Sequence, residues 1–212
     1  MIWSSRKKIL LEAVLLSIAL MLFSSFIHYR FPARLISFAA LLTAAYLVAK
    51  NLKTLSDLRK YTGKISLKIP VLFTLAGIAT GFLGSVLYRY HLDLSLLPDS
   101  FYGFAIIAGI IGITEELVFR GFLQGLLQQV NIPLSLLFST LSHTGYKCCL
   151  FLFPVIAADI NIGFLAFWTF TAGILLGILR HFSGSIIPPL LAHFLFDLLV
   201  YAGAAVAPWW VW

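Results

Sequence analysis

Long apolar stretches separated by short polar segments recur along nearly the whole chain of 212 residues. A helix needs roughly 20 mostly apolar residues to cross about 30 Å of hydrocarbon. The pattern predicts spans near residues 9–27, 34–49, 69–88, 101–119, 133–157, 162–179 and 185–206. The stretch from 101 to 130 either continues as one long helix past Arg120 or breaks into a second, short helix. We therefore expect six to eight helices.

The continuity of these runs determines the fold class. Backbone groups in lipid must find partners within the protein, so a spanning segment is a helix or a strand of a closed barrel. The runs are too long and too continuously apolar for barrel strands of about 10 alternating residues. We predict an all-α, multi-pass transmembrane bundle in a single integral membrane domain, 1–212. Residues 1–100 form N-terminal spans with a polar segment, 50–68, that is either an interfacial amphipathic helix or a solvated loop.

Composition supports the membrane assignment and excludes one class of partner. Hydrophobic residues make up 61% of the chain and charged residues 11%, against about 25% charged in a soluble domain; the mean hydropathy is +0.99. The net charge of +7 lies mainly in short segments between apolar runs, which is the positive-inside pattern rather than a nucleic-acid surface. The expected partner is the bilayer, and the expected location is a plasma membrane with the N-terminus in the cytoplasm.

The basic residues of the polar segment 50–68 carry most of this asymmetry. They are Lys50, Lys53, Arg59, Lys60, Lys64 and Lys68. They share a side with the N-terminal charges if the spans alternate, and we assign that side to the cytoplasm. Cys148 and Cys149 are adjacent and have no zinc-type spacing, so neither a disulfide nor a cysteine metal site is expected.

Three charges interrupt one of the most apolar parts of the chain, in "GITEELVFRGFLQ". An ionisable group at the middle of a span costs about 2.5–3.5 kcal/mol on insertion scales, so a span that keeps one usually has a partner or a task for it. Glu116 and Arg120 are four residues apart and can pair on one helix face. Glu115 is turned away by about 100° and is expected to face a cavity. The alternative is that all three charges mark a helix end near the interface.

Two other apolar segments contain histidines. His143 lies in "LLFSTLSHTGYK", and His193 and Asp197 are four apart in "GSIIPPLLAHFLFD". Taken alone, His143 is a core histidine or a catalytic one, and the His193–Asp197 pair either binds helices together or orients an imidazole. With Arg120, Pro133 and Ser185 taken as the ends of their spans, helical rise puts Glu115, His143 and His193 about 8–15 Å deep in the cytoplasmic half of the membrane. We therefore expect the three side chains to meet.

A glutamate and two histidines in such a place suit the hydrolysis of an amide. A carboxylate in a low-dielectric pocket becomes a competent general base for water. A histidine beside it can orient that water, and a second polar cluster can face the developing oxyanion. The same residue types also form a His₂Glu metal site, and spacing alone does not separate the two possibilities.

These segments resemble a known family. "EELVFR" fits the EExxxR motif of the CPBP family of intramembrane proteases, which includes CAAX prenyl endopeptidases and bacteriocin-processing or immunity (Abi-type) proteins. The downstream histidine and the HxxxN/D ending of "GSIIPPLLAHFLFD" follow in the right order, so the resemblance covers about residues 101–200. It implies a protease core there, with an active centre that opens toward the cytoplasm.

The resemblance also implies roles for the residues singled out above. Glu115 activates the water and His143 assists it. His193 and Asp197 stabilise the oxyanion. Glu116 and Arg120 support the site. Catalysis in the family is viewed as glutamate-dependent, so no cofactor is expected; if a divalent metal such as zinc is present, Glu115, His143 and His193 are its expected ligands.

The chain departs from the family pattern at two positions. Ser139 stands where the family usually has Phe four residues before the first histidine, and Phe138 lies one residue earlier. Asp197 stands where Asn is common, and an ionised Asp cannot donate a hydrogen bond to an oxyanion. Asp197 must therefore be protonated or act through His193, or the activity is altered.

We predict an intramembrane endopeptidase that hydrolyses a membrane-associated peptide or protein. Prenylated tails, leader peptides and regulatory membrane proteins all remain candidate substrates. The alternative is a non-catalytic membrane immunity or binding protein of the same fold. A proton or ion transporter is a third possibility, but the sequence shows no inverted repeat to support it.

Overall fold

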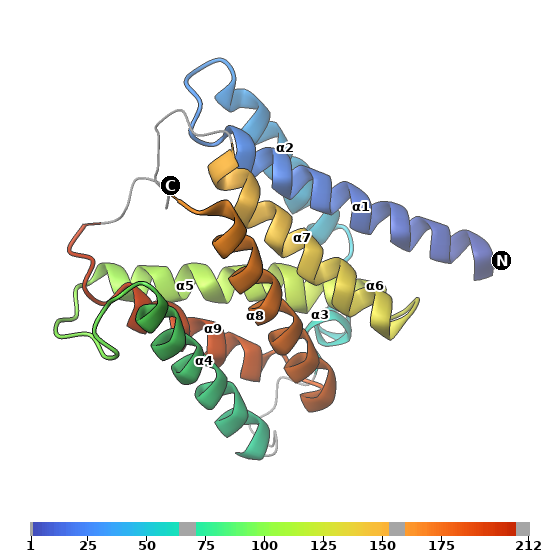
Figure 1. The fold of residues 1–212 in the computed structure, drawn as a ribbon. Helices are drawn as coiled ribbons and strands as arrows, with labels where there is room; N and C mark the ends of the chain where they lie inside the picture. The colour runs from blue at the N-terminus through green and yellow to red at the C-terminus, as the bar shows by residue number, and fades with distance from the viewer. Residues whose placement is uncertain (1, 64–70, 153–159, 207–212) are drawn as a thin grey trace. The chain divides into compact units, whose positions relative to one another are not determined.

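The computed structural model describes residues 2–63, 71–152 and 160–206, and its regular structure there is helical (Figure 1). The elements are α1 (Ile2–Phe26), α2 (Arg34–Ala49), α3 (Leu55–Thr62), α4 (Val71–His91), α5 (Phe104–Glu116), the π-helix η1 (Leu117–Leu123), α6 (Gln124–Leu127), α7 (Ile132–Leu152), α8 (Ile162–Ser183) and α9 (Ile187–Val200). Because α5, η1 and α6 follow one another without a break, the described residues form eight continuous helices. The all-α prediction is confirmed.

Three of the described helices are long and apolar enough to cross a membrane: Ser5–Phe26, Val71–His91 and Ile162–Ser183. They indicate an integral, multi-pass membrane protein. Arg34–Ala49 and Ile187–Val200 are apolar but shorter. The run expected to end at residue 119 instead continues as a helix to Leu127, so the first of the two alternatives for 101–130 holds. Residues 153–157 of another predicted span lie outside the described residues.

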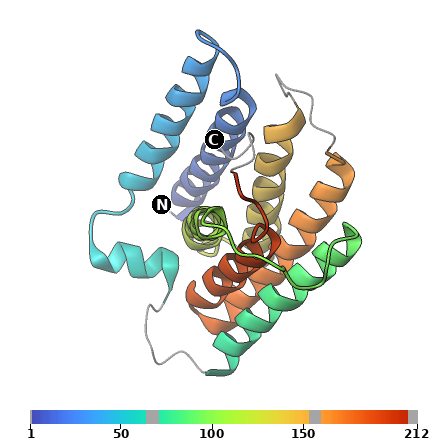
Figure 2. The same cartoon turned by 90° about the vertical axis from the view of Figure 1, so that its left-hand side faces the viewer.

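The chain divides into two compact units. Among the described residues, the first unit comprises 2–61 and those of Phe122–Ile174, and the second comprises those of Thr62–Gly121 and 175–206. In the first unit, α1 packs along α2 and α7, and Figure 2 shows α1 and α2 side by side. A hydrogen bond of 2.8 Å joins the hydroxyls of Ser17 and Ser142 across the α1–α7 contact.

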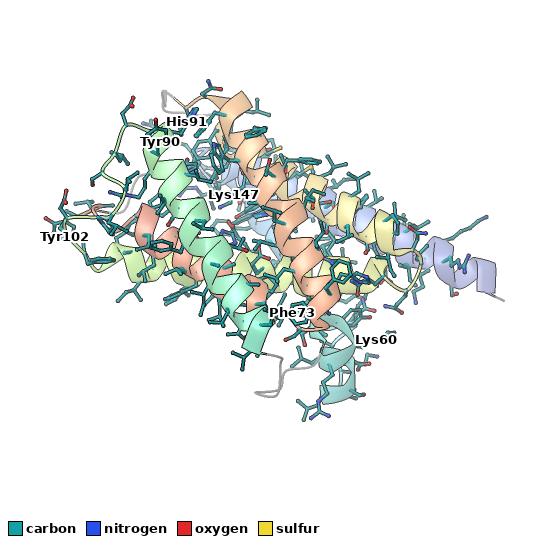
Figure 3. All side chains as sticks on the ribbon, turned by 60° about the horizontal axis from the view of Figure 1, so that its bottom comes forward. Lys60, Phe73, Tyr90, His91, Tyr102 and Lys147 are labelled. Carbon is teal, nitrogen blue, oxygen red and sulfur yellow. The ribbon has the colours of Figure 1, made fainter. Side chains whose placement is uncertain are left out.

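Within the polar segment 50–68, the described part forms the short helix α3, which begins with a reciprocal cap. The Thr54 hydroxyl accepts a bond from the Asp57 backbone N–H at 3.1 Å, and the Asp57 carboxylate accepts one from the Thr54 N–H at 2.9 Å. This arrangement satisfies backbone donors that a helix start leaves open. Lys60 is exposed on α3 (Figure 3), whereas Lys64 and Lys68 lie outside the described residues.

In the second unit, α9 packs against both α4 and α5. Its contact with α4 depends on two glycines one turn apart. A Cβ on Gly77 would lie 2.5 Å from the Pro188 carbonyl oxygen, and a Cβ on Gly81 would strike the Ala192 carbonyl. Small residues at this spacing allow the backbones of membrane helices to approach closely, where dispersion and weak polar contacts bind them. The position of α9 beside α4 is therefore set by backbone contact.

Arg89 holds the far end of the same pair of helices. Its guanidinium donates to the Ser95 carbonyl at 2.7 Å, to the Ser95 hydroxyl at 3.1 Å and to the Leu199 carbonyl at 3.1 Å. The side chain therefore connects α4, the following loop and the C-terminal turn of α9, where helix carbonyls carry partial negative charge. Arg89 is 6% exposed, while its neighbours Tyr90 and His91 at the end of α4 are exposed (Figure 3).

Two glycine variants on α4 test this packing. Gly81→Ala places a methyl group against the Ala192 backbone and should lower the free energy of unfolding by about 1–3 kcal/mol, the usual cost of overpacking. Gly84→Ala is the matched control, because its Cβ would lie at an ordinary 3.5 Å from the Phe196 ring; it should be neutral or slightly stabilising through helix propensity. The measurement is unfolding in mixed micelles, and equal losses for the two variants would contradict the backbone contact.

Candidate active site

The charges of "GITEELVFRGFLQ" lie inside a continuous helix. Glu115 and Glu116 are the last residues of α5, Arg120 lies in η1, and the helix continues for seven residues beyond Arg120. Glu116 and Arg120 are both 0% exposed. The alternative in which these charges mark a helix end is therefore wrong, because the helix continues past Arg120. The depth of Glu115 in the membrane stays a prediction. Single π-helical segments within α-helices occur often at functional sites.

The pairing expected from the i, i+4 spacing is present. Arg120 Nη1 lies 2.8 Å from Glu116 Oε1. The same carboxylate oxygen is 2.9 Å from His193 Nδ1, which comes from α9. Sequence spacing suggested Asp197 as the carboxylate that orients His193, but Glu116 makes the short contact. This contact links helices that are far apart in sequence, and no local pattern indicated it.

The other nitrogen of His193 faces two more carboxylates. Nε2 is 3.5 Å from Asp197 Oδ2 and 3.8 Å from Glu115 Oε2. These separations are those of ion pairs rather than of close hydrogen bonds. Glu115 is 6% exposed and Asp197 8% exposed. The structure therefore brings Glu115, His193 and Asp197 together in the second unit, as the sequence predicted for the first two.

The hydrogen-bond partners determine the tautomer of His193. Arg120 is an obligate donor, so the Glu116 oxygen that it contacts is an acceptor, and the buried guanidinium charge favours the ionised carboxylate. Nδ1 of His193 faces that same oxygen and must carry a proton to bond to it. In the neutral ring Nε2 is then an acceptor, and it donates only when the ring holds a second proton. Glu116 and Arg120 thus set which nitrogen faces Glu115 and Asp197.

His143 lies on α7, in the first unit, and is 3% exposed. Its ring stacks with Tyr146, with the centroids 6.5 Å apart. Ser139, one turn earlier, is 0% exposed and donates to the Leu136 carbonyl at 3.2 Å, so a buried hydroxyl stands at the position where the family usually has Phe. The meeting of His143 with Glu115 and His193 stays a prediction.

Whether a divalent metal binds to Glu115, His143 and His193 stays a prediction from the sequence. Within residues 2–63, 71–152 and 160–206, no group of three or more His, Cys, Asp or Glu side chains is arranged to hold a metal ion. The ligands expected for one come from both units, with Glu115 and His193 in the second and His143 in the first.

Comparison with known proteins identifies the segment that contains this site. Residues 97–199 match the model of the family described as type II CAAX prenyl endopeptidase, Rce1-like. Residues 97–199 are a domain of this Rce1-like family. No curated protein and no solved structure was found to match. Membership implies a CAAX-type protease with a peptide or protein substrate.

The Rce1-like segment contains every candidate site residue and lies close to the segment 101–200 in which the sequence resemblance was found. Sequence reasoning missed two features within it. One is the Glu116–His193 contact; the other is the close approach of α9 to Gly112 on α5. Gly112 is three residues before Glu115 in the sequence, but its role depends on which residues of α9 pack against it.

Neutralising Glu116 should destabilise this Rce1-like segment strongly. Glu116→Gln leaves the buried Arg120 without its carboxylate, and breaking a buried ion pair in this way costs about 3–5 kcal/mol. Glu12→Gln is the matched control, because its partner Lys50, 2.9 Å away, is 29% exposed and can be solvated when the carboxylate is lost; the loss should be clearly smaller than that for Glu116→Gln. Unfolding in mixed micelles measures both, and comparable losses would argue against a structural role for the Glu116–Arg120 pair.

Proposed function

We propose that the chain is an intramembrane endopeptidase in which Glu115 activates a water molecule for attack on a peptide bond. The observation that carries this proposal is the convergence on His193. One ring nitrogen contacts the Glu116–Arg120 pair, and the other faces Glu115 and Asp197. This arrangement lies in the segment that matches the Rce1-like endopeptidases.

Glu115 serves first as base and then as acid. It removes a proton from water as the water oxygen bonds to the substrate carbonyl carbon, and the carbonyl π electrons move to the oxygen as an oxyanion. Glu115 then returns the proton to the amide nitrogen, the C–N bond breaks, and a carboxylic acid and an amine leave. In this scheme His143 orients the attacking water.

His193 and Asp197 are proposed to stabilise the oxyanion. Because Nδ1 is committed to Glu116, Nε2 can donate only from the doubly protonated ring. Asp197 in its ionised form cannot donate, so it acts by stabilising that imidazolium. This division of labour gives Asp197 a role where the family commonly has Asn. Loss of one oxyanion-hole donor from a serine protease raises the barrier by about 2.7–4 kcal/mol.

The first candidate substrate is the one that the family description names, a prenylated C-terminal CAAX tail. Its lipid group would hold the peptide at the membrane beside the site. Leader peptides and membrane-bound regulatory proteins are the other substrate classes.

Terminal-peptide mass spectrometry on membranes tests the activity and finds the substrate. Wild type should produce new peptide termini that are absent from Glu115→Gln and His143→Ala membranes, in which the protein still inserts. Adding a chelator to the wild-type sample reports any metal requirement. Undiminished cleavage by Glu115→Gln would remove this mechanism, and a complete absence of cleaved products would favour a non-catalytic immunity or binding protein.

We also propose a plasma membrane location with the N-terminus and α3 in the cytoplasm, on the basis of the basic residues near both. Single cysteines at Ser5 and Asp99, in a background without Cys148 and Cys149, test the orientation. A membrane-impermeant maleimide on intact cells should label the Asp99→Cys variant and leave Ser5→Cys unlabelled until the cells are opened. The reverse labelling would overturn the assignment.

A further inference from the structure

The face of α5 that packs against α9 lacks a side chain at the point where the functional groups lie. A Cβ built on Gly112 would be 2.5 Å from Asp197 Oδ2 and 2.9 Å from His193 Cδ2, closer than real Cβ contacts come. All three atoms nearest to that Cβ belong to His193 and Asp197. Gly112 precedes Glu115 and Glu116 by three and four residues, so it lies on the same side of the helix, one turn away.

We propose that Gly112 is a positioning residue for the active site. Because it has no side chain, the Asp197 carboxylate and the His193 ring can lie directly against the α5 backbone. In this position His193 Nδ1 lies 2.9 Å from Glu116 Oε1, and His193 Nε2 lies 3.8 Å from Glu115 Oε2. The catalytic consequence of this placement rests on the proposed function, whereas the placement itself does not.

Backbone contacts on another side of α9 limit any adjustment. Gly77 and Gly81 of α4 lie against the Pro188 and Ala192 carbonyls, so a shift of α9 away from α5 must disturb the α4–α9 contact. The easier response to a methyl group at Gly112 is rotation of the two α9 side chains that it strikes. Such a rotation turns the imidazole away from its carboxylate partners.

The other glycine on this face of α5 has a different neighbour. A Cβ on Gly109 would meet the Phe194 ring, with the nearest atom at 2.6 Å. Substitution there disturbs apolar packing and leaves the ionisable groups without a direct clash. Gly103, at the start of α5, has nothing within 4 Å of a built Cβ. Gly103, Gly109 and Gly112 therefore allow the same substitution to be compared at three positions associated with one helix.

The experiment compares Gly112→Ala, Gly109→Ala and Gly103→Ala in detergent micelles. The first readout is the ¹⁵N spectrum of the His193 ring, assigned by its loss in His193→Gln, because it needs no substrate. We expect its chemical shifts to change in Gly112→Ala and to match wild type in Gly103→Ala. The change in Gly109→Ala should be smaller than in Gly112→Ala. A folded Gly112→Ala protein with a wild-type His193 spectrum would overturn the proposal.

The second readout is cleavage of the peptide found by terminal-peptide mass spectrometry. Misplacement of catalytic groups by about 1 Å can cost on the order of 10²-fold in rate. We expect kcat to fall by about that factor in Gly112→Ala, with KM changed little. A rise in KM at constant kcat would contradict a positioning role. A shifted His193 spectrum in a protein that cleaves nothing in its wild-type form would sink the proposed function and leave the placement by Gly112 intact.

A double-variant comparison keeps the inference testable if Gly112→Ala folds poorly. Asp197→Ala removes the carboxylate that the new methyl group strikes most closely. In that background, the shift in unfolding midpoint caused by Gly112→Ala should be at most half of its value in wild type, because neighbouring sites couple through their shared contact. An undiminished shift would show that Gly112 serves only general packing and would overturn the proposal.

Discussion

A buried carboxylate oxygen of Glu116, shared between Arg120 and His193, organises the second unit around its site. It lies 2.8 Å from the guanidinium nitrogen and 2.9 Å from the imidazole nitrogen. An isolated charge in an apolar interior is too costly to keep, so Glu116 and Arg120 pair within their own helix. The same carboxylate oxygen also contacts His193, and this contact connects α5 to α9. It also leaves the second ring nitrogen of His193 directed at Glu115 and Asp197.

The close packing of α9 depends on glycines as well as on the ionisable side chains. Apolar burial adds little to helix association in lipid, so backbones must approach closely to gain dispersion and polar contacts. Gly77 and Gly81 permit that approach between α4 and α9, and Gly112 permits it between α5 and α9. Near the C-terminal ends of α4 and α9, Arg89 connects the two helices by donating to the Leu199 carbonyl at 3.1 Å. The polar groups are thus held by a helix that has few other positions available to it.

Family membership and geometry support the same chemistry from different directions. The Rce1-like match covers residues 97–199 and implies a CAAX-type protease. The geometry adds that the His193 tautomer is set by Glu116, so that the role proposed for Asp197 runs through the imidazolium. His143 belongs to α7 and the first unit, whereas Glu115 and His193 belong to the second. Its proposed task of orienting the attacking water is therefore the one step assigned to a residue of the first unit.

The sequence by itself determined the all-α class, most helix positions and the Glu116–Arg120 pair. Each of these follows from hydropathy or from residues within one turn, where spacing translates directly into geometry. It also singled out Glu115 and His193, because an ionisable group in an apolar run stands out for its cost. Only the tertiary structure decided that the helix continues past Arg120, that Glu116 rather than Asp197 makes the short contact with His193, and that Gly112 lies beneath them both. The last two facts depend on how α9 packs against α5, and packing between segments far apart in the sequence produces no periodic pattern in the chain.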